Sequence, residues 1–288
     1  MKFNTKTIHG GQIKEKAYGA VMPPIYQTST YSQKSPGEHS GYEYSRTQNP
    51  TRHALERSIA SLENAKYGLA FSSGLSAIDA IMKLFSPGDE IISTNDLYGG
   101  SYRLFEKVFK KFGLKFVFTD LRNLNEIENL ISSKTKLIWV ETPTNPMINV
   151  VDIESLSKIC KTNNLLLAVD NTFSTPFLQK PIDLGADIVV CPRVTDAAVV
   201  IGPAAWKFNW ERDNFDALAG ALAAGHIIEC GCQATGGNYS FFKEVPSFDN
   251  VGYPIAEIFE DGSFNITKHA GTGGLVSKGT VTAQLLYE

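Results

Sequence analysis

The sequence predicts an α/β fold in which helices cover both faces of a mostly parallel sheet. Short apolar segments rich in β-branched and aromatic residues alternate with helical patterns from about residue 51 to residue 190. The chain has 288 residues, of which 43% are hydrophobic and 20% charged, and this composition is ordinary for a globular protein with a sizeable core. Its length fits one large α/β domain or two smaller ones.

The chain opens with a segment that has no long apolar period. Residues 1–50 contain several Pro, Gly, Ser and Tyr residues, and this pattern predicts an irregular arm. An amphipathic helix is predicted directly after it, because Leu55, Ile59 and Leu62 recur at helical spacing and share one face.

Six apolar runs then predict strands, and the gaps between most of them hold helical patterns such as SYRLFEKVFKKF and DIESLSKICKTN. Strand followed by helix, repeated along the chain, is typical of parallel sheets. Ligands of such sheets bind outside the carboxyl ends of the strands, so the residues that follow each strand carry the candidate chemistry. The predicted strands are GLAFSS (68–73), EIIST (90–94), KFVFTD (115–120), KLIWVET (136–142), LLLAVD (165–170) and ADIVV (186–190).

The first candidate site follows GLAFSS, where small residues connect the predicted strand to a helix. Ser73 and Gly74 stand at the start of that helix, and its free N–H groups and dipole favour an anion such as a phosphate. A plain serine cap of the helix is the alternative interpretation.

Three further candidates follow later strands. Tyr98 offers a ring face to a planar ligand or is a core tyrosine, and Asn145 is a positioned amide or part of a rigid turn between two prolines. Asp170 ends an apolar strand, where a carboxylate is costly unless it is paired; a protonated ring nitrogen is one partner, and a cap for the next turn is the alternative. Together these sites predict a pocket for pyridoxal phosphate, with its phosphate, ring and pyridinium nitrogen each matched.

Residues 1–190 resemble the Cys/Met-metabolism family of pyridoxal-phosphate enzymes, which includes cystathionine γ-synthase and cystathionine γ-lyase. The similarity is nearly continuous and includes TKTIHGG, GYEYSRTQNPTRHALE, GLAFSSGLSAI, WVETPTNP and VDNTFSTPFLQKP. It implies an incomplete fold-type-I large domain at 51–190, a transsulfuration-type amino-acid substrate and a homo-oligomer. It also implies a set of cofactor contacts, the first two reaching a neighbouring subunit: Tyr44, Arg46, Ser73, Gly74, Leu75, Tyr98, Asn145, Asp170 and Thr172.

The resemblance ends just after the last predicted strand. In this family that strand runs into HSATKY or a close relative, whose lysine forms the Schiff base with the cofactor. Thr195 stands at the position of that lysine, and Pro192 and Val194 replace the two hydroxyl residues that flank it. The next lysine, Lys207, lies twelve residues further on, and catalytic geometry must be held to within about an ångström. We therefore expect no catalytic lysine, and weak, non-covalent binding of pyridoxal phosphate at most.

Residues 191–288 resemble a different family, that of acyclic terpene utilisation. The similarity includes RVTDAAVVIGPAAWKF and LAGALAAGHIIECGCQATGGNYSFF, and members of both families carry a GADIVV-type strand before the point of divergence. The composition changes there too, since the last 98 residues hold 12 of the 24 glycines and have eleven acidic against six basic residues. The sequence thus predicts a chimera with an unrelated α/β-type tail, either a non-enzymatic or artefactual fusion or a terpenoid-catabolism protein by its tail.

Two motifs of the tail have alternative interpretations. Residues 271–274 (GTGG) fit an anion-binding loop, but no Lys-Ser or Lys-Thr completes a phosphate-binding motif, so a plain loop is favoured. His226, Glu229, Cys230 and Cys232 contain donor atoms for a metal, but their spacing matches no standard zinc pattern. We assign no metal site.

Charge and hydropathy exclude several classes of function. The net charge is −3 with no basic block, and no apolar stretch reaches the roughly 18–20 residues of a membrane span. The first residues contain no apolar core of a secretory signal, and four cysteines are too few for a disulfide framework. We expect a cytoplasmic protein without nucleic-acid or membrane partners.

Overall fold

The computed structural model describes residues 1–191 and 197–287. The chain divides into two compact units, residues 1–192 and 193–288, and each is described by itself. The substituted positions Pro192, Val194 and Thr195 lie outside the described residues.

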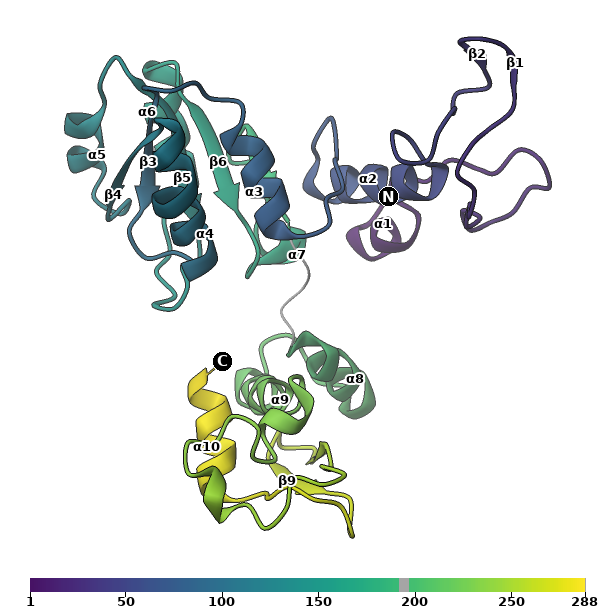
Figure 1. Cartoon of the computed structure of the whole chain (residues 1–288), viewed down its shortest axis with the longest axis vertical. Helices are drawn as coiled ribbons and strands as arrows, with labels where there is room; N and C mark the ends of the chain where they lie inside the picture. The colour runs from purple at the N-terminus through teal and green to yellow at the C-terminus, as the bar shows by residue number, and fades with distance from the viewer. Residues whose placement is uncertain (192–196, 288) are drawn as a thin grey trace. The chain divides into compact units, whose positions relative to one another are not determined.

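A five-stranded parallel sheet forms the centre of the first unit (Figure 1). Its strand order is β4-β3-β5-β6-β7, so the chain crosses over the sheet between consecutive strands. Five of the six predicted strands are confirmed. Their bounds are β3 (Glu90–Thr94), β4 (Lys115–Thr119), β5 (Thr135–Glu141), β6 (Leu166–Asp170) and β7 (Ile188–Val190).

Alternating side chains of β5 divide the core of this unit into two layers. Ile138 and Val140 pack on one face of the sheet with residues of α5 and α6. Leu137 and Trp139 point to the opposite face, where residues of α3 and of the segment after α4 cover them. The predicted helix–sheet–helix architecture is confirmed. The helices are α3 (Gly74–Met82), α4 (Gly99–Arg103), α5 (Leu124–Leu130), α6 (Ile153–Thr162) and α7 (Thr175–Leu178).

The helical pattern after α4 is irregular. A π-helical turn (Leu104–Val108) and a 3₁₀ turn (Phe109–Phe112) continue it to Gly113, whose φ of 89° ends the segment. Phe105 is fully buried in this segment, stacked on the ring of Phe116 with 4.8 Å between centroids.

The predicted strand GLAFSS is wrong. The structure has no strand between α2 (Pro50–Glu63) and α3, and Leu69 in this segment is 74% exposed. A strand needs a neighbour for its backbone N–H and C=O groups, and β7 is an edge of the sheet with no described strand on its outer side. Apolar composition alone does not make residues 68–73 a strand without that partner.

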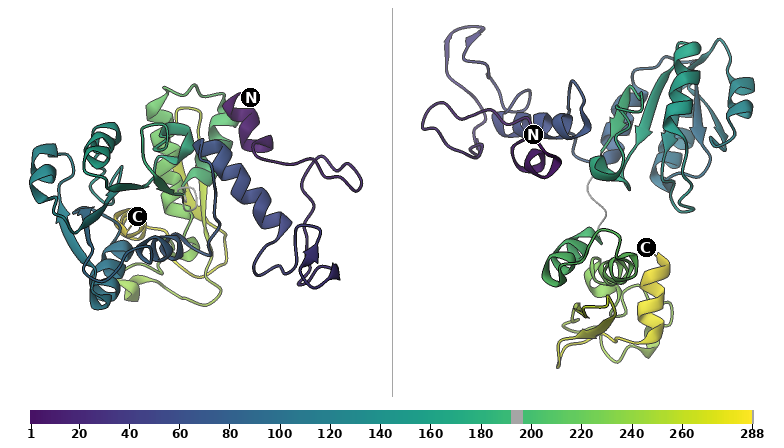
Figure 2. Two further views of the ribbon diagram at one scale, coloured as in Figure 1. Left: turned by 90° about the horizontal axis from the view of Figure 1, so that it is seen from above. Right: turned by 180° about the vertical axis from the view of Figure 1, so that it is seen from behind.

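The arm contains more local structure than expected. Residues 3–9 form α1 (Phe3–His9), and Gln33–Ser35 (β1) pairs with Glu38–His39 (β2) in a short hairpin. The predicted helix that follows is confirmed as α2 (Pro50–Glu63), but Leu55 on its apolar face is 60% exposed. In two views the segment with β1 and β2 extends beyond α2, away from the five-stranded sheet (Figures 1 and 2).

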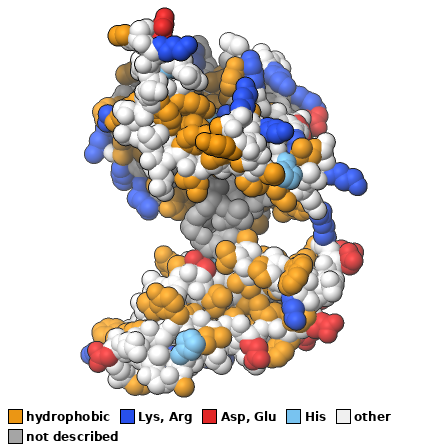
Figure 3. Space-filling model, turned by 90° about the vertical axis from the view of Figure 1, so that its right-hand side faces the viewer, with side chains coloured by type: hydrophobic (Ala, Val, Ile, Leu, Met, Phe, Trp, Pro, Cys, Tyr) orange, Lys and Arg blue, Asp and Glu red, His pale blue; other side chains and the backbone are white. Residues whose placement is uncertain are grey.

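The arm exposes a large share of its apolar side chains. Figure 3 faces the arm and shows hydrophobic side chains among lysines and arginines on its surface. Tyr18 is 97% exposed, Val21 82% and Ile25 76%, which is unusual for large apolar residues in one short segment.

The second unit has a buried core of its own. Its central helix α9 buries Ala217, Ala221, Ala224 and Ile227. Gly220 lets this helix approach the following hairpin, since a Cβ there would lie 2.0 Å from a backbone oxygen of Gly262. The elements are α8 (Ala198–Phe208), α9 (Phe215–Ile228), β8 (Pro254–Ile258), β9 (Phe264–Lys268) and α10 (Lys278–Tyr287), with 3₁₀ turns at Gly231–Gln233 and Phe242–Glu244.

The glycine loop of the tail uses its N–H groups internally. The amides of Gly273 and Gly274 donate to the carbonyls of Asn250 and Ser247, at 3.0 and 2.7 Å. These contacts favour a structural turn over an anion site. Among the residues that the structure describes, no group of three or more His, Cys, Asp or Glu side chains could hold a metal ion. Within the same residues, no helix is long and apolar enough to cross a bilayer.

Candidate functional site

The carboxyl ends of β3, β5 and β6 bring three of the site's residues to one edge of the sheet. Glu141 and Asp170 are the last residues of the neighbouring strands β5 and β6, and they are register partners across the pair. Tyr98 follows β3, and its backbone N–H donates to Oε2 of Glu141 at 2.9 Å. The structure therefore places Tyr98 and Asp170 after the ends of strands, as expected, while their contacts with a cofactor stay a prediction.

Asp170 is a buried carboxyl group, only 6% exposed, and burial raises its pKa above the ordinary value. The backbone N–H of Thr172 donates to its Oδ1 at 3.2 Å, and the hydroxyl of Thr172 donates to the same oxygen. Thr172 thus holds the Asp170 carboxyl group by two hydrogen bonds, which agrees with the position near Asp170 that the resemblance implied. No ion pair to Asp170 is found among the described residues, so its carboxylate can take a cationic partner.

Glu141 belongs to this site although it was not among the predicted residues. It is 5% exposed, and its pKa is raised to about 8, first by burial and then by the negative charge of Asp170. The sequence contained a signal for it: Glu141 follows the apolar run KLIWV just as Asp170 follows LLLAV. Carboxylates at the ends of two buried strands form a pair when those strands are neighbours in the sheet, as β5 and β6 are.

Tyr98 is 46% exposed, so it is a surface ring and not the core tyrosine of the alternative interpretation. Its ring lies against Gly100, where an added Cβ would come within 2.2 Å of the tyrosine Cε1. Only glycine at position 100 leaves room for this ring orientation. The exposed ring face remains available to a planar group.

Ser73 is the N-cap of α3, as one of the two interpretations held. Its Oγ accepts from the N–H of Ser76 at 3.1 Å, and Oγ of Ser76 accepts from the N–H of Ser73 at 2.9 Å, a reciprocal capping box. Gly74 and Leu75 form the first helical positions, and their N–H groups have no partner inside the helix. The two interpretations are compatible, because a capped helix start still presents these two amides.

The loop after β5 is tied to the loop after β3. Asp96 accepts from the hydroxyl of Thr144, from the N–H of Met147 at 3.2 Å and from Nδ2 of Asn149 at 3.2 Å. Asn145 lies inside this loop, half-buried, and its backbone N–H donates to Glu141. The peptide bonds before Pro143 and Pro146 are both cis.

A third buried carboxyl group lies beside the end of β7. Oε1 of Glu63 accepts from Sγ of Cys191 at 3.2 Å and from Nδ2 of Asn171 at 3.4 Å. Burial raises the pKa of Glu63, and burial together with Glu63 raises that of the Cys191 thiol. The thiol is thus held protonated and serves as a hydrogen-bond donor.

Two predicted residues do not join this edge within one chain. Tyr44 and Arg46 lie in the arm, with the guanidinium of Arg46 5.0 Å from the centre of the Tyr44 ring. Their predicted contact with a neighbouring subunit stays a prediction. Lys207, the first lysine after position 195, is exposed on α8 of the second unit.

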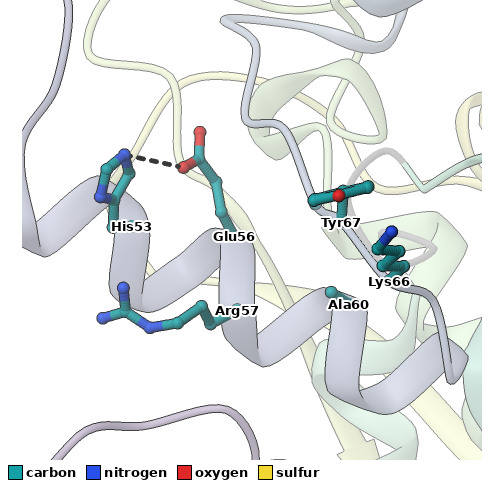
Figure 4. Close-up of a pocket in the computed structure, with 7 residues that line it drawn as sticks. His53, Glu56, Arg57, Ala60, Lys66 and Tyr67 are labelled. Carbon is teal, nitrogen blue, oxygen red and sulfur yellow. Dashed lines mark ion pairs between the residues drawn. The ribbon is translucent and has the colours of Figure 1, made fainter.

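A shallow hollow lies on α2 and does not coincide with the sheet edge. His53, Glu56 and Arg57 line it together with Tyr67, and the imidazole of His53 lies 3.7 Å from Glu56 (Figure 4). Glu56 also accepts from the N–H of Ala70 at 3.1 Å. These contacts hold the segment after α2 in place, so a structural role explains the residues that line the hollow.

The residues at the sheet edge fit pyridoxal phosphate. Asp170 is a buried carboxyl group without a cation in the described chain, and it matches a protonated ring nitrogen. Tyr98 offers an exposed ring face, and the start of α3 offers amides to a phosphate. The donor set matches each chemical part of that cofactor.

Comparison with known proteins finds similarity to a different family in each unit. Residues 4–193 match the Cys/Met metabolism PLP-dependent enzyme family, and residues 178–288 match the acyclic terpene utilisation family protein AtuA. Both matches include residues 178–193, the segment at which the two resemblances meet. The predicted resemblance of the chain to two families is confirmed.

The relatives of the first unit are enzymes of sulfur amino acids. A cystathionine beta-lyase of Coxiella burnetii is 50% identical over 187 residues, covering 65% of this chain and 48% of the relative. A cystathionine gamma-lyase of Bacillus subtilis is 50% identical over 190 residues, covering 66% and 50%. The chain thus spans about half the length of the curated relatives it matches.

Solved structures show the same fold. The cystathionine gamma-lyase of Lactobacillus plantarum, complexed with L-serine, has a TM-score of 0.64 and 48% identity, covering 70% of this chain and 52% of that one. The metB protein of Corynebacterium glutamicum has a TM-score of 0.64 and 46% identity, covering 66% and 50%. Because residues 4–193 match its family model, the chain belongs to the Cys/Met metabolism family of PLP-dependent enzymes.

Proposed function

We propose that this chain is a cystathionine lyase- or synthase-like protein that binds pyridoxal phosphate weakly and non-covalently and does not catalyse the family's reaction. The observation that carries the proposal is Asp170, a buried carboxyl group at the end of β6 with a raised pKa and no ion pair in the described chain. Burying a carboxyl group at a strand end is costly, and a cationic ring nitrogen offsets that cost.

The chain's own residues account for binding and orientation. The Asp170 carboxylate would accept the proton of the ring nitrogen, the face of Tyr98 would stack on the ring, and the amides of Gly74 and Leu75 would donate hydrogen bonds to the phosphate oxygens. When bound, the cofactor supplies an electron sink for carbanions formed at an amino-acid substrate. Asn145 lies in the loop that Asp96 holds in place, and by the resemblance it would contact the hydroxyl side of the ring.

Loss of catalysis is proposed from the residue at position 195. Thr195 has a hydroxyl group where the family has a lysine amine, and it can neither bond covalently to the cofactor nor move a proton as an amine does. Pro192 and Val194 also remove two hydroxyl groups from the phosphate side. Binding then depends on the non-covalent contacts alone, so we propose that it is weak.

The remaining attributes follow from family membership. We infer a homo-oligomer in which Tyr44 and Arg46 of one copy complete the phosphate site of another. The exposed apolar residues of the arm, Tyr18 and Val21 among them, support such an association. We also infer a small amino-acid ligand and a cytoplasmic location.

A terpenoid-related role through the second unit is the alternative function. It is favoured by the match of residues 178–288 to the AtuA family and by the unit's own core around α9. Binding of a terpenoid acyl compound by the chain, with Asp170 variants unaffected, would favour this alternative.

Replacing Asp170 with asparagine should weaken binding of pyridoxal phosphate about 30-fold or more, because one partner of a buried charge pair is removed. The measurement is equilibrium dialysis with pyridoxal phosphate at pH 7. Glu128→Gln is the charge-matched control, since Glu128 is exposed on α5, and its affinity should equal that of the parent. Equal affinity of the Asp170→Asn variant and the parent contradicts the proposal.

A further inference from the structure

Glu141 and Asp170 form a pair of buried carboxyl groups. They are register partners on adjacent parallel strands, which lie about 4.8 Å apart. The charges that act on Glu141 are Asp170 on β6 and Asp96 after β3, both of them acidic. Two buried carboxylates so placed cannot both ionise at low cost, so one of them keeps its proton.

Glu141 also connects the two loops that carry the other cofactor contacts. Its carboxyl group accepts the backbone N–H of Tyr98 at 2.9 Å and the backbone N–H of Asn145. Its own backbone N–H donates to Oγ1 of Thr94 at the end of β3, at 3.1 Å. One buried side chain therefore fixes residues after β3 and after β5 relative to Asp170.

We propose that Glu141 is a positioning residue of this site, which holds Tyr98 and Asn145 by their backbone N–H groups and carries the proton that leaves Asp170 free to ionise. The part that concerns the cofactor rests on the proposed function. The part that concerns hydrogen bonding and the shared proton rests on the contacts above and does not need the cofactor.

The direction of the pH dependence follows from the pKa of Glu141, which is raised to about 8 from its ordinary value of 4.5. Below about pH 4.5 the carboxyl group is protonated in both folded and unfolded chains, so it does not change the stability with pH. Between pH 4.5 and 8 the unfolded chain ionises first, so stability falls as pH rises. Above about pH 8 this loss is complete.

The test compares the parent with Glu141→Gln in the absence of cofactor, by thermal unfolding of the full chain from pH 5 to pH 9. Glutamine keeps an acceptor oxygen for Tyr98 and cannot ionise. We expect the melting temperature of the first unit in the variant, relative to the parent, to rise by about 5 °C or more across this range. Over the same pH range, the melting temperature of Asp170→Asn should fall less than that of the parent, because the negative charge beside Glu141 is gone. Glu128→Gln should follow the parent.

Hydrogen exchange of the Tyr98 amide separates positioning from charge. The amide should stay protected in Glu141→Gln and exchange at least tenfold faster in Glu141→Ala, which has no acceptor. With pyridoxal phosphate added, Glu141→Ala should bind about tenfold or more weakly, and Glu141→Gln within about threefold of the parent.

The outcomes distinguish this proposal from the proposed function. Parallel pH curves for the parent and Glu141→Gln, or equal Tyr98 exchange in Glu141→Ala and the parent, would overturn the role of Glu141. Absence of cofactor binding in every variant would overturn the proposed function, while the cofactor-free curves and exchange rates would still decide the role of Glu141.

Discussion

Replacing Phe105 with alanine lowers the free energy of unfolding of the first unit by about 3–5 kcal/mol. Phe105 is fully buried between the sheet and the helical segment that follows α4, stacked on Phe116 and edge-on to Trp139 at 5.7 Å. Its removal leaves a cavity that the irregular π-helical turn cannot fill by a simple shift. Thermal unfolding monitored by calorimetry measures the loss.

The control for this substitution lies two residues along the same turn. Lys107 is exposed, and Lys107→Ala should change the stability by no more than about 0.5 kcal/mol. The transition of the second unit should not move in either variant, because its buried residues belong to α8, α9 and the segments after them. A loss under 1 kcal/mol for Phe105→Ala would show that this core is not assembled as described.

Replacing Ile227 with alanine destabilises the second unit by about 2–5 kcal/mol. Ile227 is fully buried on the central helix of that unit, among alanines that leave little other apolar area to bury. Trp206→Ala is the control, because this tryptophan is 81% exposed on α8 and should contribute far less. Calorimetry of the full chain should show the loss in one transition only.

The two core substitutions together test whether the units fold separately. If each variant moves its own transition and leaves the other in place, the units have independent cores. A single transition that both variants shift equally would instead show one cooperative domain. That result would mean that the junction of the two families joins surfaces that stabilise each other.

The sequence predicted the sheet of the first unit well, because its central strands β3, β5 and β6 are largely buried and leave a continuous apolar signal. The segment 68–73 has the same apolar signal but is not a strand. A strand forms only where a neighbouring strand pairs with its backbone, and a local sequence pattern does not show whether that neighbour exists. The amphipathic pattern of α2 was also correct, yet Leu55 on its apolar face is exposed. The spacing of apolar residues identifies an amphipathic helix, but it does not show whether another part of the chain covers the apolar face.

The site was predictable where strand ends carry unusual residues. Tyr98 and Asp170 lie where the alternation of strands and helices placed them, at the carboxyl edge of the sheet. Glu141 was missed because its pairing with Asp170 depends on the order of strands, in which β5 and β6 are neighbours. The contact of Glu141 with the Tyr98 backbone likewise depends on a loop path that no local pattern gives.

The junction explains why family membership and activity need not agree. Residues 178–193 satisfy both family models, so the shared strand β7 completes the sheet whichever family the following residues come from. The resemblance places the lysine of the first family at position 195, which lies within the match to the second family alone. In our proposal the chain keeps the residues at the carboxyl edge of the sheet, and Thr195 stands where the family has the residue that bonds to the cofactor.

Borohydride reduction followed by peptide mapping tests this account most directly. The chain is incubated with pyridoxal phosphate, reduced, digested and analysed by mass spectrometry, with a full-length family member as the positive control. We predict that no lysine carries a pyridoxyl group in stoichiometric yield and that the cofactor is recovered free. A stoichiometric pyridoxyl group on any one lysine, Lys207 included, would contradict the account.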